Sequence, residues 1–287
     1  MDCIATLVAP TGLTAGDISA ARDAVGGTAA PPVDGVACDI AFVAREGARV
    51  ALEAAVPGAD VIVQPATAER RRRLLIADMD STMITVECID ELADYAGIKP
   101  HIAAITERAM RGELDFAAAL AERVALLAGM DERVIDQCLA ERVRLMPGAR
   151  TLIRTMTAHG ARAVLVSGGF TRFAEPVAAM IGFDRAVANV LEVRDGRLTG
   201  QVLPPIVDSA TKLDTLNAEL AQHGLSADQA IAVGDGANDV PMIRAAGLGV
   251  AYHGHPAAVA AADAAIRVGD HHSLLWAQGY ARADWVE

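Results

Sequence analysis

Aromatic residues are scarce in this chain, whose 287 residues include two tryptophans, three tyrosines and five phenylalanines. Long apolar runs are missing too, and none approaches the roughly 18 residues that a membrane-spanning helix needs. The start of the chain lacks the basic residues and unbroken apolar stretch of a secretion signal, because Asp2 and Asp17 interrupt it. These absences argue against a membrane protein, and we expect a cytoplasmic one.

Basic residues are also few. The chain has 25 lysines and arginines against 37 aspartates and glutamates, which gives a formal net charge of −12. Such an excess of carboxylates repels phosphate backbones and anionic lipids, so we expect neither nucleic acid nor membrane as a partner. The four cysteines are scattered, without a CxxC pair or a histidine at metal-ligand spacing. Reduced structural thiols are therefore favoured over a disulfide or a zinc site.

Four consecutive arginines, at 70–73, divide the chain into two parts. We interpret this run as a solvated face or linker rather than a nucleic-acid site. Residues 1–70 predict a small α/β module without a convergent set of catalytic side chains. Its expected elements are strands at 4–8, 36–43 and 60–63 and a helix at 14–25 that Gly26 and Gly27 would end.

Residues 71–287 contain three short apolar runs, each followed by a polar, glycine-rich segment. The runs are LLIA at 74–77, AVLV at 163–166 and AIAV at 230–233. Because they are apolar throughout and alternate with helical patterns, they predict a doubly wound, mostly parallel α/β sheet. Ligands bind such sheets beyond the carboxyl ends of the strands. The segments DMDST, SGGF and GDGAND should therefore meet in one crevice.

An insertion at about 86–146 separates the first two of these strands, and apolar residues recur there at three-to-four spacing. The pattern predicts helices over 88–96, 100–111, 115–128 and 131–143, separated by Gly97, Gly112 and Gly129. A helical insertion at this point would cover the crevice as a cap.

Asp78 and Asp80 lie two residues apart at a predicted strand end, so both carboxylates can project into the same space. Like charges this close need a cation between them, and Mg²⁺ prefers oxygen ligands. An acidic doublet alone more often ends a strand than catalyses a reaction. Asp235 in GDGAND follows another buried strand and can complete the set, which favours a metal site.

Two further segments could bind a phosphate in this crevice. Ser167 and Gly168 offer a hydroxyl and a backbone N–H group. Lys212 follows Asp208 and Ser209, either of which could cap a new helix, and supplies a compact positive charge. Taken singly, these features also fit a plain turn and a solvated lysine.

The segments DMDST, VLVSGGF, Lys212 and GDGANDVPM, in this order, resemble the haloacid dehalogenase-like hydrolases, and among these the phosphoserine phosphatases, over about 74–286. The resemblance implies that Asp78 is a nucleophile that forms an aspartyl-phosphate, and that Asp80 serves as acid and then base. It implies Mg²⁺ as cofactor, held by Asp78, Asp80, Asp235 and the Met79 carbonyl. It also implies phosphate binding by Ser167, Gly168 and Lys212, with Asn238 nearby and Asp239 orienting Lys212 or a metal-bound water.

Substrate choice is expected to reside in the cap. The resemblance implies that Glu87 and Arg123 bind the ammonium and carboxylate groups of phosphoserine, with Met110 and Phe116 lining the cap. The implied reaction is hydrolysis of O-phospho-L-serine to L-serine and phosphate, the last step of serine biosynthesis. Alternatives are another small phosphomonoester, transfer to an alcohol such as homoserine, or a binding protein without catalysis.

The module at 1–70 is similar to a degenerate regulatory, ACT-like module of the kind found on some phosphoserine phosphatases. Pro31 and Pro32 interrupt one of the strands expected in such a module. We expect at most modest control by serine, or a role in forming a homodimer.

Overall fold

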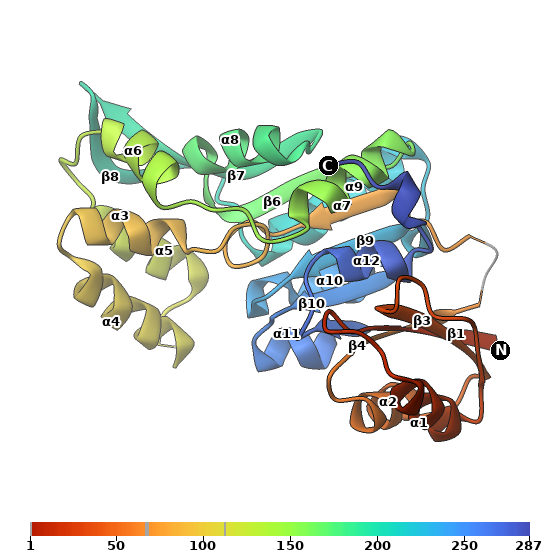
Figure 1. Cartoon of the computed structure of the whole chain (residues 1–287). Coiled ribbons are helices and arrows are strands. Elements are labelled where there is room, and N and C mark those ends of the chain that lie inside the picture. The colour runs from red at the N-terminus through yellow and green to blue at the C-terminus, as the bar shows by residue number, and fades with distance from the viewer. Residues whose placement is uncertain (1, 67–68, 112) are drawn as a thin grey trace.

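The computed structural model describes residues 2–66, 69–111 and 113–287, which form a long sheet with helices on its faces (Figure 1). In the described residues the strand order is β2-β3-β1-β4-β11-β10-β9-β5-β6-β7-β8. The strands are β1 (Asp2–Val8), β2 (Thr28–Ala29), β3 (Ala37–Val43), β4 (Asp60–Pro65), β5 (Leu74–Ala77), β6 (Arg162–Phe170), β7 (Arg185–Arg194), β8 (Arg197–Leu203), β9 (Ala230–Gly234), β10 (Leu248–Tyr252) and β11 (Ala264–Ile266).

The helices belong to three groups, which are the N-terminal module, the cap and the sheet domain. Helices of the module are α1 (Ala15–Val25) and α2 (Ala48–Ala55). Helices of the cap are α3 (Cys88–Tyr95), α4 (Lys99–Met110), α5 (Phe116–Ala125) and α6 (Arg133–Glu141). Helices of the sheet domain are α7 (Ala149–Ala158), α8 (Thr171–Ile181), α9 (Ser209–His223), α10 (Val240–Ala245), α11 (Pro256–Ala261) and α12 (His272–Ala277).

The parallel part of the sheet runs from β11 through β10, β9, β5 and β6 to β7, as the apolar runs predict. All four residues of β5 are fully buried, and successive ones enter different cores. Leu75 packs into the core beneath α7 and α8, whereas Ile76 packs into the core beneath α9 and α10. The prediction of a doubly wound, mostly parallel sheet is confirmed, and it follows from strands that are apolar on both faces.

The expected strands and first helix of the N-terminal module are present, with their own hydrophobic core. Thr14 caps α1 through a reciprocal hydrogen-bond pair with Asp17, and Gly26 ends the helix in the left-handed conformation. The pairing of Val61 in β4 with Ala265 in β11 joins the module to the parallel sheet, a continuity that the sequence did not predict. The N-terminal module therefore borders the sheet domain edge to edge.

The arginine run at 70–73 is not the solvated linker that we expected. Arg72 is 8% exposed and donates hydrogen bonds to the Gln64 side chain at 2.7 Å and the Asp228 carbonyl at 2.9 Å. Arg70 donates to the Asp39 carboxylate at 2.6 Å and to a carbonyl at the end of α12. In an extended segment alternate side chains face the protein, so two of the arginines fasten the N-terminal module to the sheet domain.

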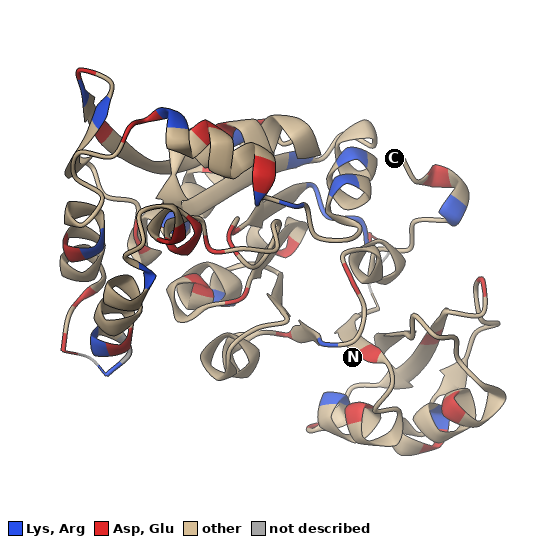
Figure 2. Ribbon diagram, turned by 60° about the vertical axis from the view of Figure 1, so that its left-hand side comes forward, with Lys and Arg blue, Asp and Glu red and all other residues tan. Residues whose placement is uncertain are grey.

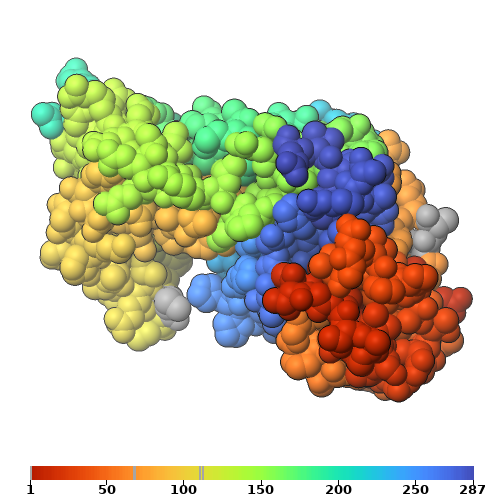
Figure 3. Space-filling view, in the orientation of Figure 1, coloured from red at the N-terminus to blue at the C-terminus, as the bar shows by residue number. Residues whose placement is uncertain are grey.

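The insertion between β5 and β6 contains α3 to α6, close to the helices expected from its apolar spacing. The β7–β8 hairpin reaches out beside these helices and packs on α5, which the sequence did not predict (Figure 1). Gly200 in β8 has φ 84°, and a Cβ there would lie 2.9 Å from Ala128 Cβ. The expected break at Gly112 lies outside the described residues, as does the side chain of Met110. In the space-filling view, a recess lies between the yellow cap and the blue C-terminal segments of the sheet domain (Figure 3).

Surface charge on the helices is mixed in sign. Figure 2 shows acidic and basic residues interspersed along the helices of the cap and of the N-terminal module. Among the described residues, each helix is too short or too polar to cross a membrane.

Candidate active site

The polar segments meet because β9, β5 and β6 are neighbours in the parallel part of the sheet. Asp78 and Asp80 follow β5, Asp235 follows β9, and Ser167 lies in the last part of β6. Lys212 lies in the first turn of α9, which packs against β5 and β6. The structure thus brings the expected acids, hydroxyl and ammonium group together at one edge, as the sheet topology predicted.

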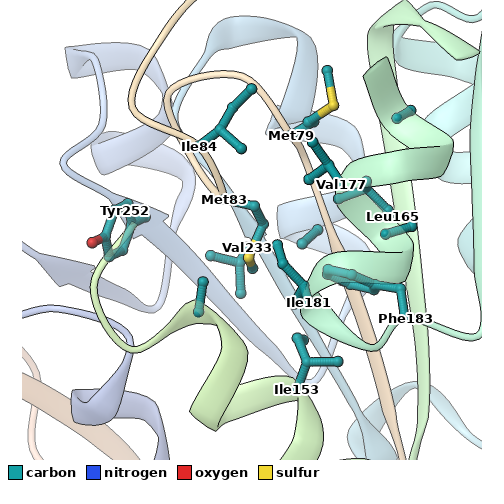
Figure 4. Close-up of a cluster of buried hydrophobic side chains, with 14 of the residues drawn as sticks. Met79, Met83, Ile84, Ile153, Leu165, Val177, Ile181, Phe183, Val233 and Tyr252 are labelled. Atoms are coloured by element: carbon teal, nitrogen blue, oxygen red, sulfur yellow. The ribbon is translucent and has the colours of Figure 1, made fainter. Parts of the chain in front are cut away.

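The loop after β5 is anchored in the core by its apolar side chains. Met79, Met83 and Ile84 are fully buried, beside Val233 and Leu165 of the neighbouring strands (Figure 4). The Met79 carbonyl accepts hydrogen bonds from the N–H groups of Met83 at 2.8 Å and Ile84 at 3.0 Å. Both lone pairs of this oxygen already accept hydrogen bonds inside the turn, and metal binding by the Met79 carbonyl stays a prediction.

Lys212 is buried, so the alternative of a solvated lysine is excluded. Asp208 accepts a hydrogen bond from the Thr211 N–H at 2.9 Å, which starts α9 and directs Lys212 inward. The Lys212 Nζ lies 2.9 Å from Asp78 Oδ1 and 2.6 Å from Asp239 Oδ1. The other oxygen of Asp239 accepts hydrogen bonds from the backbone at 235 and 236. Asp239 is thereby suited to orient Lys212.

Carboxylates outnumber cations at this point of the crevice. One oxygen each from Asp78, Asp235 and Asp239 lies within 4.8 Å of the others. Burial, and then repulsion from Asp239, raises the pKa of Asp78 well above its ordinary range and the pKa of Asp235 to about 6. Burial alone would lower the pKa of Lys212, but attraction to Asp239 and Asp78 outweighs it and raises that pKa.

These four groups fit a divalent cation, since three carboxylates face one ammonium group and two negative charges remain unbalanced. Asp78 Oδ1 accepts from Lys212 and from the Met79 N–H at 2.7 Å. Asp78 Oδ2 has no hydrogen bond among the described residues. Asp235 Oδ1 accepts one hydrogen bond, from the Thr82 hydroxyl at 3.0 Å. Asp78 and Asp235 thus keep oxygen lone pairs of the type that hard cations prefer.

Asp80 lies apart from that group of three carboxylates and has a different environment. Its Oδ2 accepts from the Cys88 N–H at 3.3 Å, and its Oδ1 is buried without a partner in the described part of the chain. Burial, and then repulsion from Glu87, raises the pKa of Asp80 to about 7. A Cβ on Gly169 would lie 3.3 Å from Asp80 Oδ2 and 3.1 Å from Ser167 Oγ, so the end of β6 closely approaches both groups. A carboxyl group in this state can both give and take a proton near neutral pH.

Two of the residues expected in the cap, Glu87 and Arg123, lie within electrostatic reach of Asp80. Arg123 is partly buried in α5, and this burial lowers its pKa. Attraction to three nearby carboxylates acts in the opposite direction and raises that pKa, but by less; they belong to Asp90, Glu87 and Asp80. The described residues place no carboxylate within 4.0 Å of its guanidinium, which donates to the Ala119 carbonyl at 3.2 Å. Glu87 precedes α3, is exposed, and accepts a hydrogen bond from the Ser81 hydroxyl at 2.7 Å.

Phe116 and Asn238 are two further expected residues of the site. A Cβ on Gly168 would lie 3.0 Å from the ring of Phe116, so α5 closely approaches the end of β6. Asn238 is partly buried in the short 3₁₀ turn Ala237–Asp239, between Asp235 and α10.

Two residues of the site were missed in the sequence. Thr82, in the DMDST segment, donates to Asp235, and the fully buried His271 contacts the Thr82 carbonyl at 2.8 Å. The position of Thr82 two residues after Asp80 was a signal that could have been followed. No local pattern links His271 to this loop, because 189 residues separate it from Thr82.

Comparison with known proteins identifies the family of this chain. The model of the haloacid dehalogenase-like hydrolases matches residues 75–244. A phosphoserine phosphatase of Streptomyces coelicolor is 46% identical over 256 residues, covering 88% of this chain and 62% of that protein. A phosphoserine phosphatase of Albidiferax ferrireducens is 46% identical over 208 residues, covering 71% of this chain and 88% of that protein. The chain thus spans less than two thirds of the length of the Streptomyces relative.

A solved structure supports the same assignment. The unliganded probable phosphoserine phosphatase of Vibrio cholerae superposes with a TM-score of 0.79 at 33% identity, covering 99% of this chain and 88% of that one. The similarity therefore includes the N-terminal module as well as the parallel sheet. On the matching model, the identities and the shared fold, this chain belongs to the haloacid dehalogenase-like hydrolase family.

Proposed function

We propose that this protein hydrolyses O-phospho-L-serine to L-serine and phosphate, the last step of serine biosynthesis, through an aspartyl-phosphate on Asp78. The observation that carries the proposal is the asymmetry of the Asp78 carboxylate. Its Oδ1 is held by Lys212 at 2.9 Å and by a backbone N–H at 2.7 Å, whereas Oδ2 is left for attack. The phosphoserine phosphatases among its relatives support the choice of substrate.

In the first step Asp78 Oδ2 forms a bond to phosphorus while the bond from phosphorus to the serine oxygen breaks. The bonding pair leaves with that oxygen, which takes the proton from Asp80. In the second step Asp80 takes a proton from water, and the water oxygen displaces Asp78 from phosphorus. A carboxyl group with a pKa of about 7 is suited to both transfers near neutral pH.

The remaining residues bind the phosphoryl group and a cation. Ser167, the Gly168 N–H, Lys212 and Asn238 would bind phosphoryl oxygens. Asp78, Asp80 and Asp235 would hold Mg²⁺, with Asp80 as the outlying member because it lies apart from the carboxylate group. A bound Mg²⁺ would neutralise negative charge on the phosphoryl oxygens.

Metal removal tests this proposal directly. Phosphate release from a panel of phosphomonoesters should be high for phosphoserine with Mg²⁺ and fall to background with a chelator. The physical reason is that the crevice has two uncompensated negative charges, which repel a phosphate dianion unless a divalent cation is bound. Restored activity after Mg²⁺ is added back is the control, and full activity in chelator would contradict the metal assignment.

Substrate choice is proposed to depend on Glu87 and Arg123. Glu87→Ala and Arg123→Ala should each lower kcat/KM for phosphoserine by about 10- to 100-fold, the effect of losing a hydrogen bond to a charged group. Turnover of an aryl phosphate, which lacks ammonium and carboxylate groups, should change little. Glu122→Ala is the matched control, because Glu122 is the neighbour of Arg123 on α5 and pairs with Arg108 instead.

Equal losses on both substrates would favour the second candidate, a phosphatase or phosphotransferase for another small phosphomonoester. The observation that favours phosphoserine is that the Arg123 guanidinium has no carboxylate partner among the described residues and can receive the carboxylate of a substrate. Residues 1–70 as a regulatory module, a homodimer and a cytoplasmic location stay predictions. Serine at millimolar concentration, added to the kinetic assay, tests the first of these.

A further inference from the structure

His271 is the N-cap residue of α12 and is buried against the loop that follows β5. Its Nε2 is 2.8 Å from the Thr82 carbonyl, which can only accept, so Nε2 carries the proton. Its Nδ1 is buried without a partner in the described residues. The ring stacks on Tyr252 with centroids 4.0 Å apart and planes within 3°. The imidazole is therefore a neutral donor held in one orientation.

Thr82 links His271 to Asp235, one of the three clustered carboxylates. Its backbone is held by His271, and its hydroxyl donates to Asp235 Oδ1 at 3.0 Å. Asp235 is also fixed on its backbone, since its carbonyl accepts from the His255 N–H at 2.8 Å. The preceding Ser81 has φ 54°, so this loop follows a left-handed path that needs support from outside. A shift of Thr82 would move the orientation of the Asp235 carboxylate.

The N-terminal module binds the loop at 267–269, which precedes His271 in the chain. Asp60, in β4, is 1% exposed, and its Oδ1 accepts from the N–H groups of Arg267 at 2.7 Å and Val268 at 3.0 Å. Its Oδ2 accepts from the Gly269 N–H at 2.9 Å. The loop that leads to His271 is thereby pinned by one side chain of the module.

We propose that His271 is a positioning residue that aligns Asp235 for cation binding through Thr82, and that Asp60 of the N-terminal module holds His271 in place. The module then supports catalysis mechanically, whether or not it binds a regulator. The kinetic part of this proposal rests on the proposed function, whereas its metal-binding part does not. Groups that orient metal ligands typically change metal affinity or activity by about 10- to 100-fold when removed.

The test compares His271→Leu with His271→Gln, whose amide nitrogen can reach the position of Nε2. Calorimetric titration of metal-free protein with Mg²⁺ should show affinity about 10- to 100-fold weaker for Leu and largely restored for Gln. In kinetic assays at saturating Mg²⁺ with phosphoserine varied, kcat of His271→Leu should fall. Its KM for phosphoserine should stay within about twofold, because Glu87 and Arg123 are unchanged. His223→Leu, at the far end of α9 and partly exposed, is the matched control.

A double-mutant cycle separates positioning from simple loss of stability. Thr82→Val removes the hydroxyl link, and its effect on Mg²⁺ affinity should not add to that of His271→Leu, because both act through the same contact. Asp60→Asn should weaken Mg²⁺ binding in the same direction. Unchanged Mg²⁺ affinity in His271→Leu, or additive losses in the cycle, would overturn the proposal.

The variants remain informative in two unfavourable cases. If His271→Leu does not fold, the Gln and Val variants still decide, because each retains the size of the side chain that it replaces. If the wild type proves inactive on phosphoserine, the proposed function fails while the Mg²⁺ titration still tests His271.

Discussion

Asp78→Asn is expected to abolish phosphate release while leaving the fold intact. The amide has no nucleophilic carboxylate oxygen, so no bond to phosphorus forms, and loss of a nucleophile costs roughly 10⁴-fold or more in kcat. The fold should survive because Lys212 keeps its contact with Asp239 at 2.6 Å. Removing this carboxylate also relieves its repulsion with the neighbouring Asp239.

Three measurements check this expectation. Steady-state phosphate release should reach background, thermal unfolding should occur near the wild-type temperature, and acid-quenched reactions should contain protein-bound phosphate only for the wild type. Asp23→Asn on α1, an exposed pair with Arg22, is the control for the substitution itself. Activity above a hundredth of the wild type would mean that another residue attacks phosphorus.

Lys212→Met should cost both activity and stability. Methionine fills a similar volume, but it leaves the fully buried Asp239 and the nearly buried Asp78 without their shared cation. Removing one partner of a buried ion pair destabilises a protein by about 3–5 kcal/mol. We therefore expect a large fall in unfolding free energy, together with loss of phosphate binding.

Denaturant unfolding in chelator gives the stability effect, and phosphate release with Mg²⁺ gives the effect on activity. The chain supplies a matched control, because its other lysine, Lys99, is half-exposed and lies 4.0 Å from Glu91. Lys99→Met should change stability by less than about 1 kcal/mol, as for surface ion pairs. Equal effects of the two substitutions would refute the role assigned to the buried ammonium group.

The accuracy of the sequence predictions depended on how local each signal was. LLIA, residues 74–77, is the β5 strand to the residue, because a central strand is apolar on both faces and needs no partner to be recognised. Arg72 was predicted wrongly, since a run of charge looks the same whether its partners are solvent or buried acceptors. The β7–β8 hairpin was missed, because it is an addition to the cap that the apolar pattern of the cap helices does not reveal.

Short motifs after apolar runs are local features, so the chemical groups at the strand ends and their order could be predicted from the sequence alone. Asp78, Asp80, Asp235 and Lys212 could be named from them. The differences between these groups follow from the tertiary structure. It shows that Lys212 lies between Asp78 and Asp239, that Asp80 lies apart, and that His271 supports Thr82. Distances and burial set those differences, and both arise from residues far apart in the chain.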